Sequence, residues 1–259
     1  MPERQQLPPL FQKNEVLFGH DAAPGLIACE IAGDDSVKVF ARDGDAIRSE
    51  TVSFQPLMLL EGDEPLAGWK GEAKIDSLAG SGAFNRLALF PNLKQLDDAK
   101  SYLQSKTGKT PSAGDAPYWY FSDSLQQFFL LSGKTHFLGM TFRDLKRMQL
   151  DIETYCQAGF SFPNPARATD RITAIALADS TGWERLISGK EFGEAEMLGE
   201  LVKEIQQRDP DVIEGHNLFR FDLEYIEARA KRHKVALNFG RDGSRLGGHA
   251  SRMQMAERT

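Results

Sequence analysis

The chain has 259 residues, of which 41% are hydrophobic and 26% charged, a composition that is ordinary for a globular protein and sufficient for two modest domains. The formal net charge of −6 is unusual for a nucleic-acid-binding protein, although a basic groove can lie beside catalytic acids. No apolar stretch approaches the roughly 20 residues that a membrane-spanning helix requires. The polar, proline-containing start has no signal-peptide pattern, so we expect a cytoplasmic protein whose two cysteines, Cys29 and Cys156, are ordinary thiols.

Residues 1–139 are expected to form a separate, smaller domain of mixed α/β type. Its strand candidates are short segments bounded by turn residues: 25–31, 36–41, 52–60 and 69–75. The sequence Gly-Asp-Asp at 33–35 separates the first two and is typical of a hairpin turn. The spacing of apolar residues predicts an amphipathic helix over 96–106, whereas periodicity does not decide between a strand and a short helix for 125–131.

Residues 140–259 show a clearer order of elements, which predicts a second α/β domain. Four segments carry the alternation or the residue types of strands: 147–154, 171–178, 183–187 and 211–214. Apolar residues at helical spacing predict helices over 194–208 and 222–234, and Pro210 stops the first of them. The order is therefore three strands, a helix, a strand and a helix, followed by a loop or tail over 240–259.

Three acidic residues in this second part carry the chemistry. Asp151 and Glu153 close the strand predicted at 147–154, and residues i and i+2 of a strand share one face. Asp222 follows the strand predicted at 211–214 and opens the next helix. Carboxylates with open coordination positions suit Mg²⁺ or Mn²⁺, and two such ions can hold both the attacking and the leaving oxygens of a phosphoryl displacement. These residues predict metal-dependent phosphodiester hydrolysis.

The surrounding motifs resemble those of family B DNA polymerases. Asp-Ile-Glu-Thr at 151–154 is similar to the first exonuclease motif of that family, and Asn-X-X-X-Phe-Asp ending at Asp222 is similar to the second. The resemblance implies that residues 140–259 form a ribonuclease H-like 3′→5′ exonuclease domain, a mixed sheet flanked by helices. It also implies that residues 1–139 are the mixed α/β amino-terminal domain of such a polymerase.

The resemblance further implies a role for each residue of the two motifs. The residue matching Asp151 bridges two divalent metal ions, Mg²⁺ or Mn²⁺, and the one matching Glu153 binds the ion that activates water. The residue matching Asp222 holds the second ion, partly through water. Asn217 and Phe221 are expected to shape the site around a DNA end, because asparagine supports left-handed turns and aromatic rings stack on unpaired bases.

Each of these residues also has a purely structural interpretation. The acidic pair could be solvated or paired with Arg147 or Arg171, and Asp222 could cap the helix that it opens. Phe221 could belong to the core. A histidine after a strand, such as His216, is more often satisfied by hydrogen bonds than catalytic, so it is expected to be a structural neighbour.

The third exonuclease motif of the family, Tyr-X-X-X-Asp, does not follow in this sequence. After Asp222 there is one tyrosine, Tyr225, and the residue four positions later is Arg229. The sequence signatures of the polymerase domain are absent as well. We therefore expect an incomplete two-metal site, and a chain that forms the amino-terminal part of a longer polymerase.

The leading hypothesis is a proofreading 3′→5′ exonuclease that acts on the 3′ ends of single-stranded DNA, with the polymerase domain of the same longer chain as its partner and no association with a membrane. Its activity in the present chain is expected to be impaired. An alternative is a non-catalytic nucleic-acid-binding module of the same fold, whose carboxylates hold metal or DNA weakly. A stand-alone RNA-trimming exonuclease is a third hypothesis, which residues 1–139 disfavour because they resemble the leading domain of a polymerase.

Overall fold

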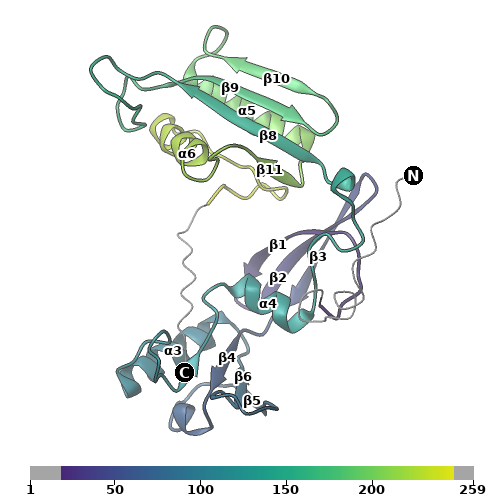
Figure 1. Ribbon diagram of the computed structural model, residues 1–259, viewed down its shortest axis with the longest axis vertical. Coiled ribbons are helices and arrows are strands. Elements are labelled where there is room, and N and C mark those ends of the chain that lie inside the picture. Colours follow the sequence, from purple (N-terminus) through teal and green to yellow (C-terminus); the bar gives the residue numbers. More distant parts are fainter. Residues whose placement is uncertain (1–18, 248–259) are drawn as a thin grey trace. The chain divides into compact units, whose positions relative to one another are not determined.

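The computed structural model describes residues 19–247, and the chain divides after Gly139 into two compact units (Figure 1). Both units combine strands and helices, which confirms the predicted α/β class. Across the described residues, no helix is both long enough and apolar enough to cross a membrane.

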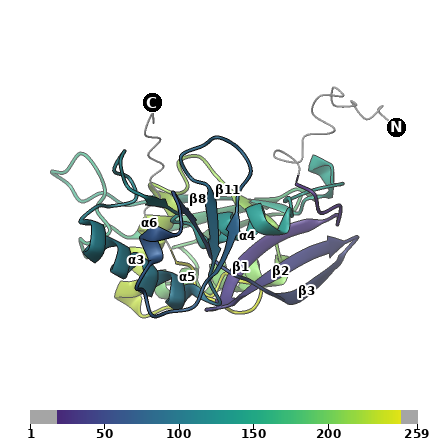
Figure 2. The ribbon, with the colours of Figure 1, turned by 90° about the horizontal axis from the view of Figure 1, so that it is seen from below.

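The first unit contains two antiparallel sheets. One has the order β1-β2-β3 and consists of β1 (Leu26–Gly33), β2 (Ser36–Asp43) and β3 (Ala46–Ser53), which lie side by side in Figure 2. The other has the order β5-β6-β4-β7 and consists of β4 (Leu57–Leu60), β5 (Lys74–Ser77), β6 (Arg86–Leu89) and β7 (Tyr118–Trp119). The helical elements of this unit are η1 (Glu64–Leu66), α3 (Leu93–Thr107) and α4 (Ser124–Ser132).

The single strand predicted over 52–60 is wrong. These residues contribute to two strands in different sheets, β3 and β4. Pro56 lies between the two strands and has no N–H to donate to a sheet ladder. Phe54 turns into the core against Phe128 of α4, where the two ring centroids are 6.1 Å apart. The chain therefore changes sheets where the sequence suggested continuity.

The strand predicted over 69–75 is also mostly wrong, because β5 begins only at Lys74. Trp69 directs its ring edge-on to Phe90, with the ring centroids 5.7 Å apart. Gly71 lies so close to this ring that a Cβ atom there would meet it at 2.1 Å. Because the backbone at Gly71 turns against the ring of Trp69, residues 69–73 do not adopt the extended conformation of a strand.

The ambiguous segment at 125–131 is helical, and its two ends explain why. The Oδ1 atom of Asp123 accepts the N–H groups of Leu125 (2.8 Å) and Gln126 (3.4 Å), which caps the start of α4. Gly133 ends the helix in the left-handed region, with φ of +66°. The amphipathic helix and the hairpin turn predicted elsewhere in this unit are confirmed, as α3 and as the connection between β1 and β2.

The second unit contains one four-stranded sheet and two α-helices. In the order β10-β9-β8-β11, its strands are β10 (Glu184–Ser188), β9 (Ile172–Asp179), β8 (Arg147–Thr154) and β11 (Val212–Glu214). The first three form an antiparallel meander, and β11 runs parallel to β8. The helical elements are η2 (Phe142–Asp144), α5 (Glu194–Arg208) and α6 (Asp222–His233). The predicted order of three strands, a helix, a strand and a helix is confirmed (Figure 1).

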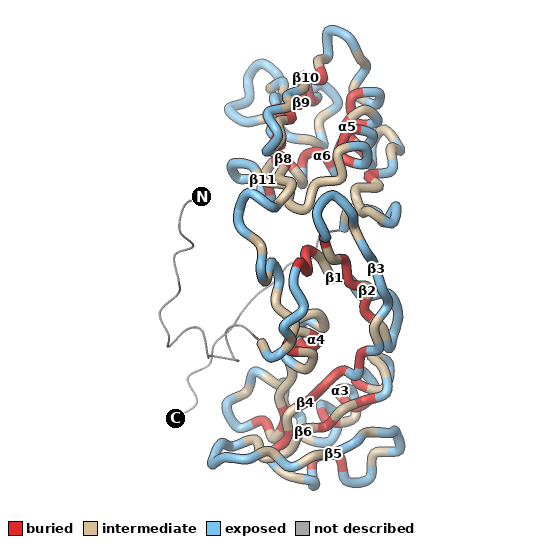
Figure 3. Tube along the Cα trace, turned by 90° about the vertical axis from the view of Figure 1, so that its right-hand side faces the viewer, coloured by how far each residue is buried: buried red, intermediate tan, exposed pale blue. Residues whose placement is uncertain are grey.

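The core of this unit lies between the sheet and its two helices. Alternation along β8 turns Met148, Leu150 and Ile152 inward, where they join apolar residues of α5 and α6 in one buried cluster. Figure 3 colours the buried stretches of these elements red. The intervening residues of β8 project from the opposite face of the sheet, which these helices leave open.

A buried ion pair ties the two helices together. The side chain of Arg229 in α6 is only 1% exposed, and it bonds Glu194 at the start of α5 through Nε (2.7 Å to Oε1) and Nη2 (2.5 Å to Oε2). Its Nη1 also donates to the backbone carbonyls of Pro165 (3.1 Å) and Arg167 (2.8 Å) in the loop between β8 and β9. Glu194 in turn accepts the N–H of Ile172 at the start of β9 (2.8 Å). One guanidinium therefore fixes both helices and this loop.

A second buried acid holds the same loop. Asp170 is fully buried, accepts the N–H groups of Gln157 and Asn164, and pairs with Arg167, whose guanidinium keeps the pKa of Asp170 well below its ordinary value. The hydroxyl of Tyr225 in α6 donates to the backbone carbonyl of Asp170 (2.9 Å). Tyr225 is therefore part of the core, and burial raises the pKa of its hydroxyl to about 12.

We expect Arg229→Ala to lower the free energy of unfolding by about 3–5 kcal/mol, because it leaves the Glu194 carboxylate buried without its partner. Urea unfolding followed by circular dichroism measures this change. Lys231→Ala is the matched control, since it removes an exposed cation from the same helix and should stay within about 0.5 kcal/mol of the original chain. Equal losses in the two variants would contradict a structural role for the pair.

Candidate metal and nuclease site

The two acids of the first motif lie on the open face of the sheet. Asp151 and Glu153 are both exposed, and in β8 they alternate with the buried residues of the core. Within the described part of the chain, neither carboxylate accepts a hydrogen bond or forms an ion pair with Arg147 or Arg171. Arg147 instead pairs with Glu214 of β11, at 2.6 Å. The interpretation of the acidic pair as partners of these arginines is therefore wrong.

Asp222 joins α6 to the edge of β8. Its Oδ1 atom accepts the N–H of Ile152 at 3.2 Å, and this N–H belongs to the residue between Asp151 and Glu153. The edge is free for this bond because β11 pairs only with residues 147–149 of β8. The side chain of Asp222 is nearly buried, in contrast to the exposed acids beside it.

The interpretation of Asp222 as a helix cap is wrong. The N-cap position of α6 is occupied by Phe221, and no side chain caps the helix there. Asp222 is the first helical residue, and its carboxylate accepts the N–H of Ile152 in the neighbouring strand. The start of α6 therefore delivers a carboxylate to the strand that carries the first motif.

Burial and charge both disfavour the ionised form of Asp222. Desolvation is the main cause that raises the pKa of its carboxyl above the ordinary value, and the charge of Asp151 raises it further. The bond from the N–H of Ile152 and the nearby His216 act in the opposite direction. A cation placed between the two aspartates would relieve the repulsion between them.

The three carboxylates are suitable ligands for a divalent cation, although their side chains do not surround a common point in this structure. Asp151, Glu153 and Asp222 offer the hard carboxylate oxygens that Mg²⁺ and Mn²⁺ prefer. The structure brings Asp222 within electrostatic range of Asp151, while Glu153 shares only the face of Asp151. Among residues 19–247, no three His, Cys, Asp or Glu side chains lie close enough together to hold a metal ion as they stand. Binding would require these carboxylates to move together.

The two residues predicted to contact a DNA end have different environments. Asn217 is exposed and has a φ of +55°, the left-handed conformation that asparagine tolerates. Its carbonyl accepts the N–H groups of Arg220 (3.1 Å) and Phe221 (3.0 Å), which closes a turn before α6. Phe221 is half-buried and packs on the core, with its ring centroid 5.5 Å from that of Tyr225. Phe221 therefore contributes to the core, and Asn217 forms the turn that precedes α6.

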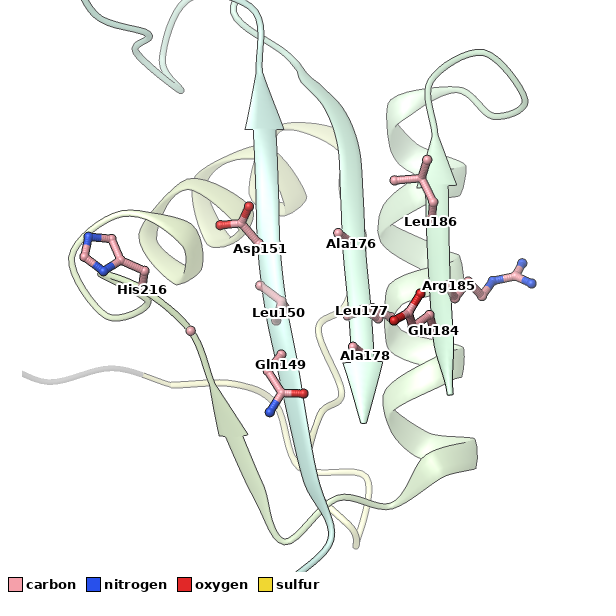
Figure 4. A pocket seen from close by; sticks show the side chains of 11 residues that line it. Gln149, Leu150, Asp151, Ala176, Leu177, Ala178, Glu184, Arg185, Leu186 and His216 are labelled. Carbon is pink, nitrogen blue, oxygen red and sulfur yellow. The ribbon is translucent and has the colours of Figure 1, made fainter. Parts of the chain in front are cut away.

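An open cavity of about 770 Å³ lies on the exposed face of the sheet (Figure 4). Its lining comes from β8, β9, β10 and the segment after β11: Gln149, Leu150, Asp151, Ala176, Leu177, Ala178, Glu184, Arg185, Leu186, Gly215 and His216. The small side chains of Ala176 and Ala178 leave room beside Asp151, because they lie opposite Asp151 and Gln149 in the sheet. The cavity therefore opens onto the first motif.

His216 is a residue of this cavity whose role the sequence did not reveal. A Cβ atom on Gly215 would meet the carbonyl oxygen of Leu150 at 2.5 Å, so the chain passes tightly against β8 at that point. This approach places His216 beside Asp151 at the rim of the cavity. Among the described residues the ring of His216 has no hydrogen-bond partner, and its exposed position leaves it open to solvent. The preceding glycine was the available signal for the close approach.

Residues 135–257 match the family model described as DNA polymerase family B, exonuclease domain. This part of the chain is similar to the exonuclease domain of DNA polymerase family B. The chain is 34% identical over 107 residues to the DNA polymerase of Archaeoglobus fulgidus, a match that covers 41% of this chain and 13% of that protein. The DNA polymerase of Pyrococcus glycovorans is 36% identical over 110 residues, covering 39% and 13%. The chain therefore spans well under a fifth of the length of these curated relatives.

A solved structure confirms the fold of the family B exonuclease domain. The family B DNA polymerase from the hyperthermophilic archaeon Pyrobaculum calidifontis matches with a TM-score of 0.58 and 19% sequence identity. The match covers 83% of this chain and 33% of that chain. The second unit is accordingly ribonuclease H-like, as the two motifs predicted.

In metal-free buffer, we expect Asp222→Asn to stabilise the exonuclease domain at neutral pH. Because the pKa of Asp222 is raised in the folded chain, its ionisation weakens the fold; this effect is absent below the ordinary pKa of 3.8 and complete once the pH exceeds the folded pKa. Asparagine stays neutral and can still accept the N–H of Ile152. Urea unfolding with a chelator at several pH values tests this, and an advantage for the variant that persists in acid would contradict the assignment.

Proposed function

We propose that the second unit is a metal-dependent 3′→5′ exonuclease module that acts on single-stranded DNA ends. The observation that carries the proposal is the bond from the N–H of Ile152 to Asp222, because it brings the acid of the second motif to the strand that carries the first. The exonuclease-domain match over residues 135–257 supports the same reaction class. A strand end is favoured over duplex because a terminal nucleotide must unstack to reach acids on a sheet.

The residues that would hold metal are Asp151, Glu153 and Asp222. When bound, divalent ions would supply an activated water and neutralise the charge of the phosphate. Asp222 contributes a carboxylate fixed by Ile152, whereas the exposed side chains of Asp151 and Glu153 are free to adjust to the ions. Asn217 and Phe221 would shape the approach of the DNA end, through the left-handed turn and the half-buried ring respectively.

We further propose that this module is part of a longer polymerase, with residues 1–139 as the family's amino-terminal domain and residues 140–259 as its exonuclease domain. The structural match covers 83% of the chain, which is more than the second unit alone and supports this division. The polymerase domain of the same longer protein would then be its partner.

One observation favours weak catalysis, or the alternative of a non-catalytic nucleic-acid-binding module. Tyr225 and Arg229 have the four-residue spacing of the third exonuclease motif, yet both are occupied by the fold. The hydroxyl of Tyr225 bonds the carbonyl of Asp170, and Arg229 is paired with Glu194. Neither side chain is available to orient water or to bind a cation. Within residues 19–247, these two positions therefore supply neither a further metal ligand nor a water-orienting group.

We expect Mn²⁺ to bind the chain weakly, because Mg²⁺ and similar ions rely on several waters and substrate oxygens when few carboxylates are present. Asp151→Ala should lower the affinity by about tenfold or more. Isothermal titration calorimetry measures both affinities. Glu184→Ala is the control, since it removes an exposed acid across the same cavity without touching the motif. Equal Mn²⁺ affinity in the original chain and Asp151→Ala would rule out the assigned ligands.

The 259-residue chain should degrade single-stranded DNA very slowly or undetectably in Mn²⁺. Supplying a downstream helix with Tyr-X-X-X-Asp should increase the rate by at least about 10²-fold, since mispositioned catalytic groups already reduce rates on that scale. The assay follows a 5′-labelled oligonucleotide, with Asp151→Ala as the control for contaminating nuclease. Robust cleavage by the shorter chain that depends on Asp151 would show that another residue replaces the third motif.

A further inference from the structure

The cavity beside Asp151 has three side chains with N–H groups in its lining, and two of them already have acidic partners. The Nε2 group of Gln149 donates to Glu214. The guanidinium of Arg185 forms ion pairs with Glu200 (3.2 Å) and Glu204 (2.9 Å) of α5, on the other side of the sheet. Each of these two side chains therefore has at least one acidic partner, although the amide of Gln149 keeps a second N–H.

His216 differs from the other two donors. It is exposed and its imidazole forms no hydrogen bond or ion pair within residues 19–247. Its backbone position is nevertheless well defined, between Gly215, which lies tight against Leu150, and Asn217, whose turn leads into α6. Figure 4 shows His216 on the segment next to the strand that carries Asp151. Its exposed side chain can change its χ1 rotamer without displacing a protein partner among the described residues.

The negative charge around the cavity makes the hydrogen-bond donor of His216 relevant to the binding of a phosphate. Asp151 and Glu184 both line the cavity, and Asp222 lies nearby, so the surroundings repel an anion. A phosphodiester needs hydrogen-bond donors as well as cations to replace its hydration at such a place. Of the three N–H-bearing side chains in the lining, His216 is the one whose side chain has no hydrogen-bond or ion-pair partner within residues 19–247.

We propose that His216 donates a hydrogen bond to the terminal phosphodiester of a nucleic-acid strand bound at Asp151. This inference rests on the proposed function, and it assigns a substrate-contacting residue at the same site. The contact is one of binding: the imidazole N–H replaces a water hydrogen bond to a non-bridging phosphate oxygen. The strand then lies with its last linkage at the rim formed by His216 and Asp151.

The test measures binding by fluorescence anisotropy in Ca²⁺, which also takes carboxylate and phosphate oxygens as ligands. The probe is a 5′-fluorescein thymidine tetranucleotide. His216→Ala should weaken its binding by about tenfold, the size expected for a hydrogen bond to a charged group. His216→Gln keeps a side-chain N–H and should recover most of the affinity. The exposed position of His216 makes both variants compatible with the fold.

A second probe separates phosphate contact from a change in cavity shape. In this probe the last linkage is a methylphosphonate, which lacks one charged acceptor oxygen. The original chain and His216→Ala should bind it equally well. Leu186→Ala is the matched control, since it alters the same cavity without removing a donor and should affect both probes alike. A His216→Ala effect of equal size on both probes, or on neither, would overturn the proposal.

Asp151→Ala distinguishes the two levels of the hypothesis. If it weakens binding of the phosphodiester probe while His216→Ala does not, the contact by His216 is wrong and the metal site stands. If Asp151→Ala leaves binding unchanged, the proposed function fails, and the inference built on it fails too.

Discussion

The buried pair between Arg229 and Glu194 is the constraint on which the second unit depends. A guanidinium removed from water must have its donors satisfied, and here Glu194 and the carbonyls of the β8–β9 loop supply the acceptors. Because those acceptors come from α5 and from the loop, the pair holds α6 against both of them. The position of α6 determines where Asp222 lies. The placement of a candidate metal ligand therefore follows from an ion pair elsewhere on the same helix.

The carboxylate of Asp222 both stabilises the fold and lies near Asp151 at the candidate metal site. Its bond to the N–H of Ile152 closes the edge of β8 where β11 has ended, and this contributes to the fold. The same bond holds a desolvated acid near Asp151, so the two charges repel. An arrangement of this kind stores unfavourable electrostatic energy that a bound cation would release. This is the physical reason for assigning metal binding to a site whose carboxylates are not yet gathered.

Tyr225 and Arg229 show how a motif spacing can be used by the fold instead of by catalysis. Their four-residue spacing places them on one side of α6, and that side faces the core. Tyr225 bonds the backbone of Asp170, while Arg229 completes the ion pair with Glu194. The helix that follows the second motif thus uses both side chains to stabilise the domain.

The sequence by itself determined the elements of the second unit and the common face of Asp151 and Glu153. Strand alternation, helical spacing and the stop at Pro210 each involve only a few neighbouring residues. They can therefore be recognised in the sequence without knowing how the rest of the chain folds. Tertiary structure alone decided the change of sheet at Pro56, the bond from Ile152 to Asp222 and the free ring of His216. These features depend on partners far away in the chain, and local periodicity contains no information about which distant groups will meet.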